Sequence, residues 1–466
     1  MVKPGSPVHG SDRGSDEQLV RDELARRIPG AELVLDPDVM DAYSRDRAMT
    51  AVAGAPCALV RAGSVTTVQE VMAVASKHRT PVVPRGLGTG LSGGSTAIDG
   101  CIVLSTEAMR SIEVDAPAML AVVGPGLRNA EVKQAAVAAG LWYPPDPSSF
   151  EICSIGGNLA TNAGGLCCVR YGVTTDYVLG LQVVLADGRA VRLGGRTIKD
   201  VAGYDLKRLF VGSEGTLGVI TEATLRLRPP PPPTATVVAT FDSLVGAGAA
   251  VAELASSMRP AAMELMDSAA IDAVERVTSM GLDLEAAALL LVQVDAGTAQ
   301  GDQVVECFER AGATYVAHST DPDEGEMLMA ARRMAIPCVE RTGTVLIEDV
   351  GVPLPAIPEL LTRIQRVSQD RDTSIPVIGH AGDGNFHPLV TFDPSDPEAA
   401  RRARAAFDEI MGVAIELGGT VTGEHGIGTL KAAHLTDQLG GEVMELTTAV
   451  KSALDPLGIL NPGKWV

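Results

Sequence analysis

The chain has 466 residues, which is long for a single hydrophobic core and predicts two or more domains. Hydrophobic residues make up 46% of it and charged residues 21%, as in an ordinary globular enzyme, whereas aromatic residues make up only 3%. The net charge of −20 argues against a nucleic acid or an anionic membrane as partner, and no apolar run reaches membrane-spanning length.

The first 16 residues are polar, and we predict a disordered tail rather than a signal peptide. Lys3 and Arg13 stand among Gly, Ser, Pro and Asp, and no apolar segment follows them. The seven cysteines are scattered and include no C-x-x-C pair, which argues against a zinc ribbon or an iron–sulfur cluster. These features favour a reducing, cytoplasmic setting and leave peripheral membrane attachment open.

A capping-box pattern, Thr67-x-x-Glu70, predicts the start of a helix. The glycine-rich segment at residues 84–95 predicts a loop that binds phosphate. Glycines can turn successive backbone N–H groups toward one anion. The segment contains a G-x-G-x-x-G pattern, which in a Rossmann domain opens a helix. Here it runs into a strand-like apolar run at 102–104, which argues against that fold. The candidate cofactor residues are Pro84, Arg85, Gly86, Gly88, Thr89, Gly90, Leu91, Ser92 and Gly93.

Two further glycine-rich regions lie in the same part of the chain. Each one alone is more often a tight turn between strands. Three in one domain favour a large, extended ligand such as a dinucleotide. The additional candidates are Pro145, Ser149, Ser154, Gly156, Gly157, Asn158, Thr161, Asn162, Gly164 and Gly165 in the second region, and Glu214, Gly215, Gly218, Val219 and Ile220 in the third.

Five consecutive prolines at residues 229–233 mark the clearest domain boundary, because such a run forms a stiff, extended spacer. We therefore expect one domain at residues 17–228, a second at 234–422 and a C-terminal segment at 423–466. Strand and helix patterns alternate in the second domain, which predicts an antiparallel sheet with helices on one face.

Histidines in two short motifs predict a metal site. Asp383-Gly384 is a two-residue hairpin signal, and pairing outward from it places His380 opposite His387 on one face. Glu424 lies in the second motif, and two histidines with one carboxylate suit Zn, Mn or Fe(II). Because neighbouring residues usually point apart, Glu424 would complete the site and His425 would stay free as a base. The alternative is a pair of polar histidines on an exposed hairpin.

Taken together, these motifs resemble the FAD-linked D-2-hydroxyacid dehydrogenases and oxidases, which include D-lactate dehydrogenase, D-2-hydroxyglutarate dehydrogenase and the flavin subunit of glycolate oxidase. The resemblance runs from about Asp36 to Trp465. It implies an α+β fold of the vanillyl-alcohol oxidase type. That fold has a two-part FAD-binding domain of the PCMH type, an inserted cap domain with a seven-stranded antiparallel sheet, and a C-terminal segment that returns to the FAD domain.

The resemblance also implies roles for individual residues. The glycine regions would hold FAD, and Asn461 and Lys464 would bring the tail back to the flavin. The first glycine segment has no histidine that could tether the flavin, so we expect non-covalent FAD. The implied metal ligands, for Zn or Mn, are His380, His387 and Glu424; the implied base is His425, with Asn385 facing the substrate hydroxyl and Arg332 pairing the substrate carboxylate.

One position departs from the hydroxyglutarate enzymes, because Ile347 stands where they have a lysine that helps to hold the acid. We therefore expect oxidation of a D-2-hydroxy acid of the lactate, glycolate or longer apolar type to the 2-oxo acid, with hydride passing to flavin N5. The alternatives are other chemistry on the same fold, as in the alkylglycerone-phosphate synthase branch, or the flavin subunit of a multi-subunit glycolate oxidase. The electron acceptor is left unidentified, and the oligomeric state is left open, a homodimer included.

Overall fold

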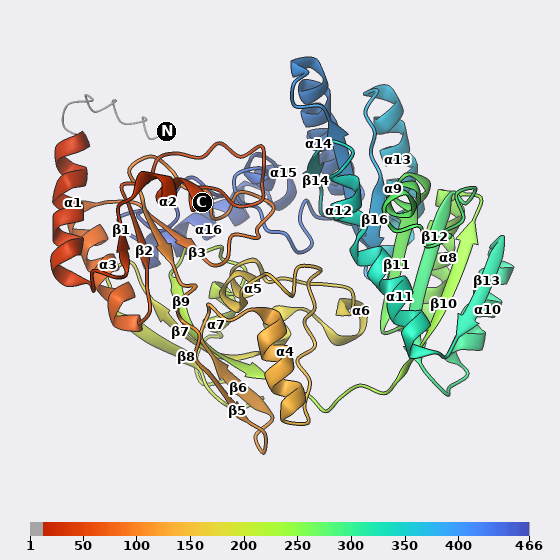
Figure 1. Ribbon diagram of the computed structural model, residues 1–466, viewed down its shortest axis with the longest axis horizontal. Coiled ribbons are helices and arrows are strands. Elements are labelled where there is room, and N and C mark those ends of the chain that lie inside the picture. The colour runs from red at the N-terminus through yellow and green to blue at the C-terminus, as the bar shows by residue number, and fades with distance from the viewer. Residues whose placement is uncertain (1–12, 466) are drawn as a thin grey trace.

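The computed structural model describes residues 13–465 and is built on three sheets (Figure 1). These sheets have four, five and eight strands. The two smaller sheets and the C-terminal helices form one body, and the largest sheet with its helices forms a second body at the opposite end from α1. In the part of the chain that the structure describes, no helix is both long and apolar enough to span a bilayer.

The first body contains a mixed sheet of order β1-β2-β4-β3 and an antiparallel sheet of order β5-β6-β9-β7-β8. The strands are β1 (Leu33–Val34), β2 (Ala58–Arg61), β3 (Val82–Arg85), β4 (Ile102–Ser105), β5 (Ile112–Asp115), β6 (Leu120–Val123), β7 (Val178–Val184), β8 (Ala190–Gly194) and β9 (Val219–Arg226). The helices are α1 (Arg13–Arg27), α2 (Pro37–Ala42), α3 (Val65–His78), α4 (Asn129–Ala138), α5 (Ile155–Thr161), α6 (Cys168–Tyr171), η1 (Thr174–Tyr177) and α7 (Lys207–Phe210).

The predicted tail is helical where the structure describes it. Residues 1–12 lie outside the described residues, and residues 13–16 form the first turn of α1. Val20, Leu24 and Ile28 recur at four-residue spacing, and their side chains are buried in one core with side chains of α3. The expectation of a tail that extends to residue 16 is therefore wrong over its last turn.

Helix α3 begins before the predicted capping box. Ser64 is the N-cap, and the backbone N–H of Thr67 donates to its hydroxyl at 3.1 Å, so the box at Thr67 and Glu70 is wrong. The prediction for the next segment holds, because β3 and β4 pair in parallel and residues 86–101, all described, contain no helix. The first glycine segment therefore joins two strands directly and is not a Rossmann turn.

The second body is a sheet of order β13-β10-β12-β11-β16-β17-β14, with every pair antiparallel and β15 also paired to β17. Its strands are β10 (Thr234–Phe241), β11 (Ala262–Asp267), β12 (Ala288–Asp295), β13 (Tyr315–Ser319), β14 (Thr344–Ile347), β15 (Val350–Gly351), β16 (Val377–His380) and β17 (Asn385–Phe392). Its helices are α8 (Leu244–Ser257), α9 (Ser268–Thr278), α10 (Gln300–Arg310), α11 (Pro322–Arg333), α12 (Ala335–Val339), η2 (Leu354–Ala356), α13 (Ile357–Asp370) and α14 (Pro397–Glu416).

Both faces of this sheet are covered, so the expectation of helices on one face is wrong. On β12, Leu290 and Val292 join a core with α8, α10, α13 and α14, whereas Leu289 and Leu291 join a core with α9, α11 and α12. A strand covered on both sides is apolar at consecutive positions instead of alternating, which the run at 288–292 shows. The face that carries α11 and α12 turns toward the first body (Figure 1).

The C-terminal segment returns to the first body, as predicted. It contains η3 (Ala432–His434), α15 (Leu435–Leu439) and α16 (Gly441–Leu454). Beyond α16, Leu460 forms a parallel bridge with Val82 at the edge of β3. The Asn461 amide donates to the carbonyls of Gly94 and Glu214 at 2.8 and 2.7 Å, so it ties two glycine regions together.

Candidate active site

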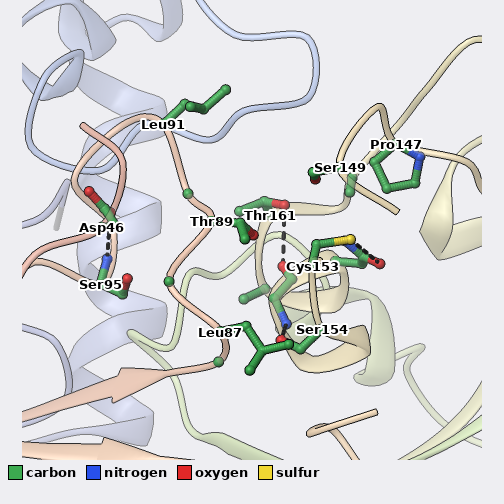
Figure 2. Close-up of a pocket in the computed structure, with 18 of the residues that line it drawn as sticks. Asp46, Leu87, Thr89, Leu91, Ser95, Pro147, Ser149, Cys153, Ser154 and Thr161 are labelled. Carbon is green, nitrogen blue, oxygen red and sulfur yellow. Dashed lines mark hydrogen bonds between the residues drawn. The ribbon is translucent and has the colours of Figure 1, made fainter. Parts of the chain in front are cut away.

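An elongated cavity runs between the two bodies, from the glycine regions to the histidine motifs. Figure 2 shows Leu87, Thr89 and Leu91 of the first segment along one wall, with Ser154 and Thr161 of the second region nearby. The predicted cofactor residues that line it are Pro84, Arg85, Gly86, Gly88, Thr89, Gly90, Leu91, Ser92, Ser149, Ser154, Gly156, Gly157, Asn158, Thr161, Glu214, Gly215, Gly218, Val219 and Ile220.

Six of the predicted cofactor residues lie elsewhere: Gly93, Pro145, Asn162, Gly164, Gly165 and Asn461 are not among the lining residues. Asn162 ends α5 in the left-handed conformation, and its side chain accepts from the backbone N–H of Thr175 at 2.9 Å. Gly164 and Gly165 line a second cavity behind the histidines. Asn461 braces the cradle from outside through its two hydrogen bonds.

Close approach of the first two glycine regions depends on Gly86. A Cβ atom at this position would lie 2.2 Å from the Ser154 hydroxyl, which caps α5 by accepting from the N–H of Gly157 at 3.2 Å. The absence of a side chain at Gly86 thus lets the first glycine segment pack closely against the Ser154 hydroxyl. The lining therefore fits a dinucleotide such as FAD, with backbone along its length and ionisable groups at one end.

Glu214 links the third glycine region to the Glu-His motif. Its carboxylate accepts from the backbone N–H groups of Ile427 and Gly428 at 2.6 and 2.9 Å. Burial raises the pKa of Glu214 to about 7, although these two donors favour the charged form. From the other side, the Ser92 hydroxyl donates to the His425 carbonyl at 3.4 Å. The glycine regions thereby fix the position of the loop that carries His425.

The histidine hairpin has a different register from the predicted one. His380 pairs with Asn385 and Ile378 pairs with His387, so residues 381–384 form a four-residue connection and the predicted two-residue turn is wrong. His380 and His387 are diagonal neighbours instead of opposite ones. Because strand side chains alternate with a period of two, both still lie on one face, and their ring centroids are 5.2 Å apart.

Both histidines direct Nε2 at the same carboxylate. The distances from Glu424 Oε1 are 3.2 Å to His380 Nε2 and 3.4 Å to His387 Nε2. On the opposite ring edges, His380 Nδ1 lies 2.8 Å from Glu264 and His387 Nδ1 lies 3.3 Å from the Glu348 carbonyl. Acceptors at Nδ1 leave the Nε2 lone pairs for a ligand role, so these three side chains fit a divalent metal.

His425 stacks on His387, with ring centroids 4.8 Å apart and planes at 11°. Burial lowers the pKa of His425 to about 4 in spite of the nearby Asp349 carboxylate, so the imidazole is neutral at neutral pH. Its Nδ1 has no hydrogen-bond partner among the described residues. Asp349 Oδ2 accepts from the backbone N–H groups of Glu424 and His425 at 2.9 and 2.7 Å and so anchors the loop.

A second combination of possible metal ligands lies in the same cluster. The ligand atoms of Asp349, His387, Glu424 and His425 all lie within 4.8 Å of one another. This set shares His387 and Glu424 with the predicted one but replaces His380. Since His380 is the residue whose Nδ1 edge is held by a carboxylate, the predicted set fits the usual carboxylate–histidine–metal arrangement better.

Arg332 lies on α11 and borders the main cavity together with His387, Glu424 and His425. The side chain is only 2% exposed, and its Nη2 lies 3.0 Å from Glu264. Nε and Nη2 nevertheless have no hydrogen-bond partner among the described residues. A guanidinium at the border of a cavity suits a carboxylate ligand. Arg333 also borders the cavity, but it pairs with Glu326.

Asn385 and His380 do not border the main cavity. Both line the second cavity, on the other side of the Glu424 carboxylate, which borders both spaces. The structure therefore brings Arg332, His387, Glu424 and His425 together at the main cavity but leaves Asn385 away from it. The predicted contact of Asn385 with a substrate hydroxyl has no support in this arrangement.

Sequence reasoning missed Glu264 and Asp349, both buried. Each carried a signal, since Glu264 is a lone carboxylate inside the apolar run 262–266 and Asp349 follows directly on strand β14 and Glu348. A charged residue within a buried strand needs a partner, and this requirement could have marked both positions.

Comparison with known proteins gives matches over most of the chain. The family model described as "FAD linked oxidases, C-terminal domain" matches residues 230–465, and that described as "FAD binding domain" matches residues 56–194. The chain belongs to the FAD-linked oxidase family. This membership confirms the family and the FAD-binding domain predicted from the sequence.

Among its curated relatives, the FAD-linked oxidase is similar to proteins named for two activities. It is 41% identical to the glycolate oxidase subunit GlcD of Bacillus subtilis over 416 residues, 88% of each chain. It is 38% identical to GlcD of Escherichia coli K12 over 456 residues, 96% of this chain and 91% of the relative. It is 36% identical to D-lactate dehydrogenase of Archaeoglobus fulgidus over 411 residues, 88% of this chain and 91% of the relative.

Solved structures with the same fold have little sequence identity to this chain. The 4-ethylphenol oxidase from Gulosibacter chungangensis gives a TM-score of 0.80 at 19% identity, covering 98% of this chain and 97% of that one. p-Cresol methylhydroxylase gives a TM-score of 0.80 at 17% identity, covering 97% of each chain. These likenesses confirm the predicted vanillyl-alcohol oxidase type of fold.

Proposed function

We propose that the protein oxidises a D-2-hydroxy acid of the lactate, glycolate or longer apolar type to the 2-oxo acid, with non-covalent FAD and a divalent metal, Zn or Mn. The observation that carries this proposal is the meeting of Arg332, His425 and the His387–Glu424 pair at one end of a glycine-lined cavity. The relatives named glycolate oxidase subunit and D-lactate dehydrogenase support the substrate class.

The residues at this end divide the work by their chemistry. The Arg332 guanidinium, which borders the cavity, would pair with the substrate carboxylate. His425 is neutral and borders the cavity, and its imidazole would accept the proton of the substrate hydroxyl. Asp349 holds the backbone of His425 in place, and the stacked His387 ring restricts the orientation of the base.

Two groups absent from the chain complete the chemistry. FAD, held by the glycine-lined walls, supplies the acceptor for the hydride on the substrate Cα when it is bound. A divalent metal at His380, His387 and Glu424 would supply a Lewis acid that lowers the pKa of the substrate hydroxyl. Two of these three residues, His387 and Glu424, border the same cavity end as Arg332 and His425, which supports this chemistry.

The test is anaerobic bleaching of the oxidised-flavin absorbance by a panel of D- and L-2-hydroxy acids. We expect one D-acid to bleach the flavin, and we expect chelation to abolish this and Zn²⁺ or Mn²⁺ to restore it. Preference for an L-acid would contradict the stereochemistry, and full bleaching after chelation would contradict the metal. A yellow protein that no acid bleaches would contradict the proposed function altogether.

A second candidate is the flavin subunit of a multi-subunit oxidase, because two relatives are named as subunits. Co-purification with an iron–sulfur partner that accepts the electrons would support it. Alkyldihydroxyacetonephosphate synthase shares the fold, with a TM-score of 0.73 at 18% identity over 99% of this chain and 87% of that one, and this likeness supports the fold alone.

A further inference from the structure

Glu264 occupies the point where the metal-binding and acid-binding groups meet. It lies on β11 directly opposite His380 of β16 and is 1% exposed. Its carboxylate oxygens lie 2.8 and 3.0 Å from His380 Nδ1, and Oε2 also lies 3.0 Å from Arg332 Nη2. A single buried carboxylate therefore contacts one side chain of each site.

The contact with His380 determines which ring nitrogen is free. A carboxylate accepts and cannot donate, so Nδ1 of His380 must carry the hydrogen. Nε2 lies 3.2 Å from a second carboxylate oxygen, Glu424 Oε1, and carries a hydrogen as well when no metal is bound. A metal bound between these two atoms would replace that hydrogen and take the Nε2 lone pair. Glu264 thus fixes both the tautomer and the orientation of the imidazole.

The contact with Arg332 keeps the guanidinium in the site. Arg332 is buried, and a buried cation needs an anion beside it. Glu264 Oε2 lies 3.0 Å from Nη2, and Arg332 also borders the main cavity. The carboxylate therefore neutralises the guanidinium at the border of the cavity where it would bind a substrate carboxylate.

We propose that Glu264 is a positioning residue that couples metal binding to acid binding, an inference that rests on the proposed function. The Glu264 side chain orients both His380 for the metal and Arg332 for the substrate carboxylate. Binding of either ligand then prepares the site for the other, and by linkage the two effects are equal in size. A Glu264 that served only to neutralise Arg332 would leave the affinity for metal unchanged.

The test compares the FAD-loaded full-length protein with its Glu264→Gln variant, which keeps the shape of the side chain and removes the charge. Mn²⁺ affinity is measured by calorimetry, and pyruvate affinity by the shift of the flavin absorbance, with and without Mn²⁺. In the wild-type protein we expect each ligand to tighten the binding of the other. In the variant we expect Mn²⁺ to bind about 10–100-fold more weakly. We also expect the factor by which each ligand raises the affinity for the other to fall toward one.

Asp267→Asn is the matched control. Asp267 is a buried carboxylate at the end of the same strand, but it caps α9 by accepting from the N–H of Ala270 at 2.9 Å. We expect this variant to bind Mn²⁺ and pyruvate as the wild type does. If Glu264→Gln fails to fold, Glu264→Asp replaces it, because the shorter acid keeps the charge but withdraws it from His380 and Arg332.

The outcomes separate this inference from the proposed function. Wild-type Mn²⁺ affinity and wild-type mutual tightening in the Glu264 variant would overturn the inference and leave the proposed function standing. A wild-type protein whose flavin is reduced by an acid but that takes up neither Mn²⁺ nor Zn²⁺ would overturn the metal part of the proposed function, and the inference with it.

Discussion

His425 is the side chain on which the proposed reaction depends most. Its imidazole is neutral, its Nδ1 has no hydrogen-bond partner within residues 13–465, and it borders the cavity outside the glycine-lined walls. We expect His425→Ala to lower turnover about 10²–10⁴-fold, the usual contribution of a general base, and to leave FAD content unchanged. Stopped-flow reduction of the flavin and the absorbance ratio of flavin to protein measure the two effects.

His434→Ala is the control for that variant. His434 lies in η3, and its Nε2 lies 3.3 Å from Asp408 on α14, so we expect it to serve the structure alone. Its loss should leave the rate of flavin reduction within about twofold of the wild type. A His425 variant that reduces its flavin as fast as this control would remove His425 from the role of base.

At the scale of single elements, two helices of the cap carry glycines with opposite surroundings. A Cβ atom at Gly412 in α14 would meet nothing within 4 Å, whereas one at Gly248 in α8 would lie 2.9 Å from Leu361 Cδ1 on α13. We expect Gly412→Ala to raise the free energy of unfolding by about 1 kcal/mol, because alanine is the better helix former. Gly248→Ala should lower it, since overpacking outweighs that gain.

Urea denaturation of both variants tests this prediction. Each substitution adds the same methyl group to a helix that packs on the same face of the sheet, so each serves as the control for the other. Equal changes in the two variants would show that helix propensity alone decides the outcome and that the contact with α13 does not matter.

The packing of α1 on α3 contains a pH-sensitive contact. Hydrogen bonds from Lys77 and His78 lower the pKa of Glu23 from its ordinary value of 4.5 to about 2. Because the folded-state pKa is the lower one, Glu23 stabilises the fold above pH 4.5, and this contribution is lost as the pH falls toward 2. We expect Glu23→Gln to be less stable than the wild type at neutral pH and to lose less stability on acidification.

Urea midpoints measured between neutral pH and pH 2 test this expectation. Asp41→Asn on the exposed side of α2 is the control, and it should follow the pH dependence of the wild type. A Glu23→Gln profile parallel to that of the wild type would show that Glu23 titrates alike in the folded and unfolded chains.

Much of the site could be predicted from the sequence wherever one short segment holds the information. The strand–loop–strand character of residues 82–104 and the shared face of His380 and His387 follow from local pattern. The hairpin register does not, because a four-residue connection and a two-residue turn can use the same Asp-Gly pair. Glu264 faces His380 only because β11 and β16 are neighbours, although more than a hundred residues separate them.

On the scale of the whole molecule, the cavity is built from segments that lie far apart in the chain. The cradle comes from the first half, Arg332 comes from the cap, and the base lies on the returning C-terminal segment. Arg47, before the first glycine segment, pairs with Glu340 beyond α12 at 2.7 Å across the two bodies. The site therefore exists only when the C-terminal segment and the cap are both in place.

Asn461 offers a test of this dependence at a distance from the cavity. Its amide joins the first and third glycine regions, and its φ of +43° lies in the left-handed region. Asn461→Gly keeps that backbone conformation available and removes only the hydrogen bonds. Loss of these two hydrogen bonds should loosen the cradle and weaken FAD binding about tenfold, as titration of the apoprotein with FAD would show. Thr448→Ala, on the exposed face of α16 in the same segment, is the control and should bind FAD as the wild type does. If Asn461→Gly binds FAD with the same affinity as this control, the glycine regions hold their positions without the tail.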